Sequence, residues 1–172
     1  MSMLLPNYVH SFPLIPGGGL FFLPVGIGVA LGAFFPRMKM ALVWGGMAAG
    51  VLCIVLGRRF YEGLPPPGAV QVVFFAAAIV AEAVAFRLVI PRVRALGERP
   101  LTICTLLIVG AHFLIMIPAF GLPIAVLAIL CLANVGAGFV LRGYQLPRMW
   151  FIDGLFKIGV GGLMLAASPV FA

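Results

Sequence analysis

Long runs of apolar residues alternate with short breaks along the whole chain. The breaks contain proline, glycine or charged side chains, which interrupt helices. The apolar segments are residues 14–35, 40–57, 69–91, 101–117, 121–141 and 150–171. About 20 apolar residues cross the hydrocarbon core of a bilayer as one helix. The pattern therefore predicts an all-α integral membrane protein, a compact bundle of six transmembrane helices.

The break between the fourth and fifth segments is the weakest of the five. Its sequence, IPAFGLP, is short and uncharged. Residues 101–141 are nevertheless too many for one crossing. We therefore expect a tight helical hairpin here.

The composition agrees with this pattern. Hydrophobic residues make up 64% of the chain and charged residues only 9%, with a mean hydropathy of +1.25. An average soluble domain has about 25% charged residues. We expect a single transmembrane domain over residues 1–172, with the lipid bilayer around it and no soluble domain beside it.

The formal charge of +7 comes mainly from bases in the breaks between segments. The first, third and fifth breaks hold Arg37, Lys39, Arg92, Arg94, Arg99, Arg142 and Arg148. The second break holds Arg58 and Arg59, and the fourth holds no base. The positive-inside rule then places the odd-numbered breaks in the cytoplasm and both termini outside it. This explanation leaves no basic stripe for a nucleic acid, and we expect none as a partner.

Five polar side chains fall inside the apolar segments, where such groups are costly and suggest function. They are Glu82, His112, Asn134, Asp153 and Lys157. At 1.5 Å per residue they lie roughly 14, 16, 11, 5 and 10 Å, respectively, from the predicted cytoplasmic ends of their helices. Each shares a helical stripe with small or polar residues, so the four stripes are expected to face one another. We predict that these residues bind a small solute or protons.

The two charges of the sixth segment have a simpler explanation as well. Asp153 and Lys157 are four residues apart and can neutralise each other along one helix, and Lys157 can also extend toward the interface. Glu82 has no such neighbour in its own helix. It must be protonated, hydrated, or paired with another helix, for example in a static bridge to Lys157.

His112 alone does not indicate a metal or haem site. No H-x-x-x-H, E-x-x-H or C-x-x-C spacing is present, and His10 lies in an N-terminal region that we expect to be unanchored. Cys53, Cys104 and Cys131 lie in apolar segments, as buried cysteines do. We expect no cofactor.

No enzyme motif is present either. The chain lacks G-x-S-x-G and a phosphate-binding glycine loop with its lysine. Glu82 and His112 as an acid–base pair would be the only basis for an intramembrane enzyme. We expect no catalytic residue.

Two further patterns concern how the helices pack. Glycines four residues apart, Gly28 with Gly32 and Gly46 with Gly50, favour close helix contacts. In addition, VLGRRFYEGLP after the second segment is similar to VLRGYQLP after the fifth. If this similarity is real, the chain consists of two three-helix halves with inverted topology, as in many secondary transporters.

Two short motifs resemble segments of small, uncharacterised bacterial polytopic membrane proteins. They are VGAHF in the fourth segment and FIDGLFK in the sixth, with Gly110, His112 and Asp153 as matching positions. The resemblance implies a multi-pass protein of the bacterial cytoplasmic membrane with no assigned activity.

Two functions remain open on these grounds. One is a small transporter or channel-like protein that uses the five polar residues. The other is an accessory or assembly subunit of a larger membrane complex, in which the same residues only hold helices together. A bundle of this size has little interior, so in either case a homo-oligomer or a membrane-protein partner is expected.

Overall fold

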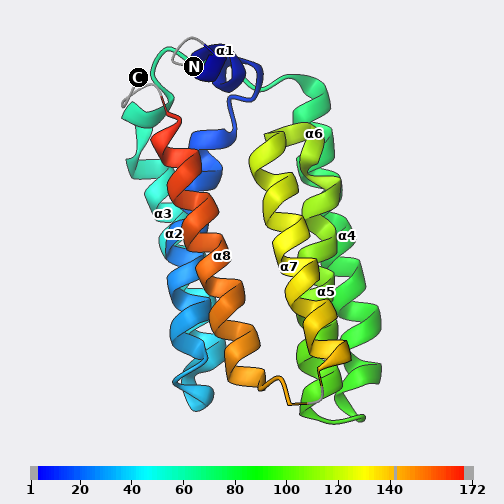
Figure 1. The fold of residues 1–172 in the computed structure, drawn as a ribbon. Helices are drawn as coiled ribbons and strands as arrows, with labels where there is room; N and C mark the ends of the chain where they lie inside the picture. Colours follow the sequence, from blue (N-terminus) through cyan, green and yellow to red (C-terminus); the bar gives the residue numbers. More distant parts are fainter. Residues whose placement is uncertain (1–3, 142, 169–172) are drawn as a thin grey trace.

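The computed structural model describes residues 4–141 and 143–168, and within these residues it is helical with no strand (Figure 1). Among the described residues, six helices are long and apolar enough to cross a bilayer. They are α2 (Ile15–Gly32), α3 (Lys39–Leu56, preceded by the 3-10 turn η1, Pro36–Met38), α4 (Ala69–Arg94), α5 (Glu98–Ile115), α7 (Leu122–Val140) and α8 (Leu146–Ala166). Short helices α1 (Leu4–Ser11), η2 (Arg58–Tyr61) and α6 (Ile117–Phe120) lie between or before them.

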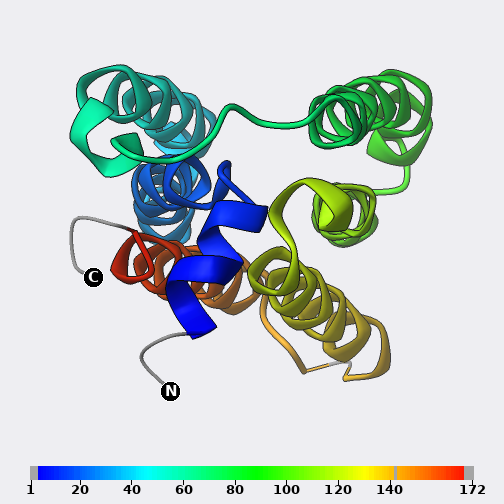
Figure 2. The same ribbon diagram turned by 90° about the horizontal axis from the view of Figure 1, so that it is seen from above.

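By their contacts, the long helices form two groups of three, and the view from above shows the groups on opposite sides of the bundle (Figure 2). In the first unit α2 packs between α3 and α8, and in the second unit α5 packs between α4 and α7. The units meet mainly where α7 packs against α8. The connectors α2–α3, α4–α5 and α7–α8 all lie at one end, which we call the basic end (Figure 1).

Glycines allow the helices of the first unit to approach closely. A Cβ added to Gly26 of α2 would lie 2.7 Å from the carbonyl oxygen of Gly154 in α8, and a Cβ on Gly154 would lie 2.6 Å from that of Gly26. On the other side of α2, a Cβ on Gly46 of α3 would lie 2.6 Å from the Pro24 carbonyl oxygen. Such contacts exclude any side chain, so α2 is held between two glycine-lined surfaces.

The predicted hairpin between the fourth and fifth segments is present in the second unit. The chain leaves α5, forms the single turn of α6 and reverses at Gly121, whose φ of +68° is rarely adopted by residues with a Cβ. α5 and α7 then pack side by side. The short uncharged connector is therefore a real break between two helices.

The N-terminal region is packed against the bundle, which corrects the expectation that it is unanchored. Val9 of α1 is 1% exposed, and the Gln71 side chain of α4 donates a hydrogen bond of 2.8 Å to the Ser11 carbonyl. The Leu122 N–H donates to the Tyr8 hydroxyl at 2.5 Å. α1 thus contacts α4 and α7 of the second unit, at the end opposite the basic end (Figure 1).

The chain order of the contacts has a simple symmetry. The three long helices of the first half, α2, α3 and α4, have counterparts in the second half, α5, α7 and α8, which run in the opposite directions. The first two helices of each half contact each other, α2 with α3 and α5 with α7. However, α4 packs on α5 and α8 packs on α2. The third helix of each half therefore belongs to the unit of the other half, and the two halves of the sequence are not separate bodies.

Several helix bounds differ from those expected from hydrophobicity. α8 begins at Leu146, one turn before the expected residue 150, because Pro147 occupies its first turn, where a missing N–H costs nothing. α5 begins at Glu98 and α4 continues to Arg94. The expected end of the sixth segment at 171 and Arg142 lie outside the described residues.

Candidate functional site

Asp153 and Lys157 form an ion pair inside the first unit. Both lie on α8, four residues apart, and the Lys157 ammonium donates a hydrogen bond to Asp153 Oδ2. Their side chains are only 2% and 3% exposed, so Lys157 does not extend to an interface as one interpretation of the sequence expected. Asp153 Oδ1 is buried and accepts no hydrogen bond from any described residue. The ion pair is therefore buried within the protein, but one oxygen of its carboxylate lacks a hydrogen-bond donor in the described part of the chain.

The Lys157 ammonium also faces the second unit. It lies 5.7 Å from the centre of the Phe113 ring of α5, a cation–π distance. It is close enough to Cys131 of α7 and to Glu82 of α4 for electrostatic interaction. Lys157 is therefore a charge at the contact between the units.

Glu82 and His112 form the second pair, which joins α4 to α5. His112 Nδ1 lies 3.7 Å from Glu82 Oε1, too far for a hydrogen bond but close enough to interact if the imidazole is protonated. The two side chains are 25% and 10% exposed, respectively. This pair is thus looser and more accessible than the pair on α8. The static bridge between Glu82 and Lys157 is not formed, because the ammonium is bound to Asp153.

The two pairs occupy the middle of the bundle. Asp153 and Lys157 are about 10 and 16 Å, respectively, from the start of α8, and Glu82 is about 18 Å from the end of α4. These values are larger than the sequence indicated because both helices extend further toward the basic end. We call Glu82, His112, Asp153 and Lys157 the central charge cluster.

Asn134 has a different place. Its amide donates to the Met149 carbonyl of α8 at 2.9 Å, and its oxygen accepts from the Tyr144 hydroxyl at 2.7 Å. The side chain is 4% exposed and uses both of its polar atoms. Asn134 therefore links α7, α8 and their connector near the basic end, and it does not join the central charge cluster.

Arg99 closes the same end of the bundle. Its guanidinium donates to the carbonyls of Gly138, Leu141 and Tyr144 at 2.6, 3.0 and 2.9 Å, respectively. These groups lie at the end of α7 and just beyond it, where helix carbonyls lack partners and a positive charge is favoured. The sequence suggested only a loop charge for Arg99. Its acceptors are 39 to 45 residues away, and nothing in the local pattern indicates them.

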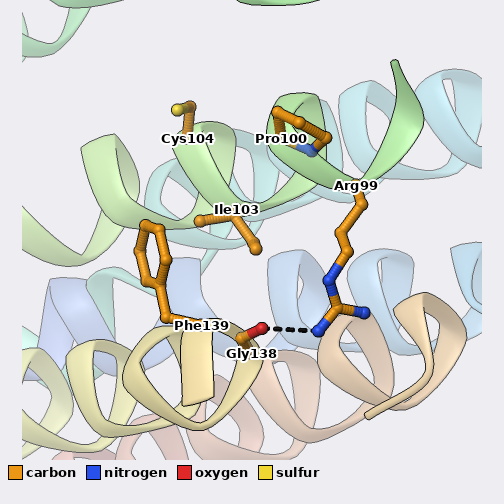
Figure 3. Close-up of a pocket in the computed structure, with 6 residues that line it drawn as sticks. All are labelled: Arg99, Pro100, Ile103, Cys104, Gly138 and Phe139. Carbon is orange, nitrogen blue, oxygen red and sulfur yellow. Dashed lines mark hydrogen bonds between the residues drawn. The ribbon is translucent and has the colours of Figure 1, made fainter. Parts of the chain in front are cut away.

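A pocket of about 210 Å³ lies beside Arg99, between α5 and α7 (Figure 3). Its lining is Arg99, Pro100, Ile103, Cys104, Gly138 and Phe139. Figure 3 shows the guanidinium turned toward the Gly138 carbonyl, so its charge is already engaged. The pocket does not contain any residue of the central charge cluster.

The five polar side chains of the predicted stripes are buried to different degrees, and that of Glu82 is the most exposed of them at 25%. Asp153, Lys157, Asn134 and Cys131 are all buried, and His112 is 9% exposed. Sequence reasoning treated Cys131 only as a small buried residue, but its thiol lies close to Asp153 and Lys157. Within the described residues, no three His, Cys, Asp or Glu side chains are grouped so that they could hold a metal ion.

The arrangement has a defined chemical capacity. Carboxyl, imidazole and ammonium groups all exchange protons, and the central charge cluster contains four such groups, from α4, α5 and α8. Of the two carboxyl side chains, that of Glu82 is 25% exposed and that of Asp153 only 2%. The cluster can therefore hold a proton on a partly exposed carboxyl group, Glu82, or on a buried one, Asp153.

Comparison with known proteins assigns a family. The model of DUF6609, a family of unknown function, matches residues 11–170, so the chain belongs to this family. No curated protein and no solved structure matches the chain.

Proposed function

We propose that this member of the family is a multi-pass protein of the bacterial cytoplasmic membrane that moves protons, alone or together with a small solute. The six long apolar helices support the location. The central charge cluster is the proposed proton-binding site, and Asn134 is a structural link rather than a ligand. We propose no catalytic step for Glu82 and His112.

The bases at the basic end support a proposed orientation. Arg37, Arg94 and Arg148 are among the bases at or next to the α2–α3, α4–α5 and α7–α8 connectors. The positive-inside rule favours this end in the cytoplasm, with α1 on the outer side. Tags added at the N-terminus and in the α2–α3 connector, probed in intact cells, test this orientation.

One observation carries the transport proposal. Glu82 is an ionisable group in the middle of a long apolar helix, it is 25% exposed, and its nearest ionisable neighbour, His112, is 3.7 Å away without a hydrogen bond. A purely structural carboxyl at that depth should be enclosed and fully paired. Incomplete pairing at that depth is what a carboxyl group that gains and loses protons requires.

Proton flux into liposomes tests the proposal. Purified protein is reconstituted, a potassium diffusion potential is applied, and internal pH is followed with a dye. Glu82→Gln should reduce the flux to that of protein-free vesicles. The matched control is Glu62→Gln, which removes an exposed carboxyl outside the long helices. Wild-type protein without flux, over a range of pH values and added solutes, would contradict transport.

The accessory role is the second candidate, and one observation favours it. The long helices α3 and α4 each pack mainly against one other long helix. Only 11% of the apolar stretch of α3 and 6% of that of α4 is buried inside the protein. Such surfaces suit a homo-oligomer or a membrane-protein partner. Mass measurement in mild detergent distinguishes the roles: an accessory subunit should be isolated with a defined partner, and Glu82→Gln should leave that complex intact.

A further inference from the structure

Each unit of the bundle contributes one of the two charge pairs. Asp153 and Lys157 belong to α8 of the first unit, while Glu82 and His112 belong to α4 and α5 of the second. Lys157 interacts with groups of both units, and one of them is the second carboxyl group, Glu82. This position distinguishes it from a lysine that merely neutralises its own helix.

The surroundings of Lys157 offer two carboxyl groups and few competitors. On its own helix, α8, Lys157 interacts with Asp153. It also interacts with one group from each of three other helices: Cys131 of α7, His112 of α5 and Glu82 of α4. α2, which packs against α8, contributes no titratable or charged group. On α4, Arg87 is exposed and five residues beyond Glu82. The choice for the ammonium is therefore between Asp153 and Glu82.

Two features make a change of partner physically reasonable. The lysine ammonium is a compact charge on a flexible four-carbon chain, so it can move without moving the helix. Asp153 Oδ1 is buried without a hydrogen-bond partner, so the existing pair does not satisfy the carboxylate fully. A buried carboxylate that lost its lysine would take up a proton, because an isolated buried charge is unfavourable.

We propose that Lys157 exchanges its partner between Asp153 and Glu82, and that one proton moves between the two carboxyl groups as it does so. In one state Glu82 is a carboxylic acid and Lys157 is paired with the Asp153 carboxylate. In the other, the Glu82 proton has passed to Asp153 and Lys157 is paired with the Glu82 carboxylate. The ammonium keeps its charge in both states, so charge and protons balance. This regulation of the proton site rests on the proposed transport function.

Infrared spectroscopy of wild-type protein in lipid vesicles tests the exchange. Asp153 is the only aspartate among the four acidic residues, so ¹³C-aspartate labels it alone. Of the glutamates, Glu62 and Glu98 are exposed, and Glu82→Gln identifies the Glu82 band. If one proton is shared, the protonated-carboxyl bands of Asp153 and Glu82 should both be present and should disappear at the same pH. A Glu82 band that titrates without any Asp153 band would overturn the exchange.

A variant tests whether Lys157 can reach Glu82. In Asp153→Asn the ammonium loses its present partner, so Glu82 should ionise to replace it. The Glu82 band should then disappear at a pH lower by about one unit or more, whereas Glu62→Gln should leave that pH unchanged. An unchanged titration of Glu82 in Asp153→Asn would also overturn the exchange.

Flux measured in the same vesicles separates this inference from the transport proposal. Flux without an Asp153 band contradicts the exchange and leaves transport standing. Both bands without flux support the exchange and contradict transport.

Discussion

The two charge pairs of the central charge cluster differ in how they are held. Asp153 and Lys157 are on one helix, in hydrogen-bond contact and 2% and 3% exposed. Glu82 and His112 are on different helices, 3.7 Å apart and 25% and 10% exposed. A closed pair on one helix suits stability, while an open pair between helices can respond to protons and to helix movement. We therefore expect mutations in the two pairs to affect different properties.

Breaking the closed pair should have the largest effect on stability. Lys157→Met leaves Asp153 buried without a cation, and it should lower the free energy of unfolding by about 3–5 kcal/mol. The double variant Lys157→Met with Asp153→Leu removes both charges and should recover most of that loss. Unfolding by dodecyl sulfate in mixed micelles, followed by circular dichroism, measures both. Equal losses in the single and double variants would show that packing, not charge, is the cause.

A buried polar group without charge provides a reference for that effect. Asn134→Ala leaves the Met149 carbonyl and the Tyr144 hydroxyl without their partner, at a cost of about 2 kcal/mol. Proton flux should persist, because Asn134 is not part of the central charge cluster. If the variant folds normally but loses flux, Asn134 belongs to the transport site after all.

Tyr144 separates the pH response of the connector from that of the charge pairs. Desolvation raises the pKa of its phenol above the usual 10.0, and the positive charge of Arg148, which lowers this pKa, offsets only part of the increase. Because the folded state favours the neutral phenol, the stability from its bond to Asn134 is present below pH 10 and decreases as pH rises through the folded pKa. Near neutral pH, Tyr144→Phe should cost about 1 kcal/mol, and the difference from wild type should vanish in alkaline solution. Unfolding free energies across this range measure it, and a difference that stays constant would contradict the assignment.

Opening the second pair should have the smallest effect on stability and the largest on flux. Glu82→Gln should change the free energy of unfolding by about 0.5 kcal/mol or less, since loose and partly exposed pairs contribute little. The same unfolding assay and the liposome assay report the two properties on one sample. A loss of stability as large as that of Lys157→Met would remove the distinction between the pairs.

The sequence predicts some parts of this structure because they depend on local patterns. Apolar segment lengths indicate the six helices, and the spacing of Asp153 and Lys157 allows their pairing within one helix. The contact of Glu82 with His112 depends instead on α4 packing beside α5, and the bonds of Arg99 depend on where α7 ends. The hydrophobic pattern places the start of α8 too late because Leu146 and Pro147 precede a charged residue, Arg148. A proline in the first turn is itself a sign of a helix start.

The exchange of third helices between the halves has a consequence for synthesis. As the chain leaves the ribosome, α2 and α3 can pair at once, but the surface of α2 around Gly26 stays uncovered until α8, the last helix, is complete. α4 meanwhile pairs with α5, so the second unit can assemble around α4, α5 and α7 before the first is finished. A nascent chain stopped before α8 would therefore expose a glycine-lined surface, which a membrane insertase or a quality-control protease could recognise as unfinished.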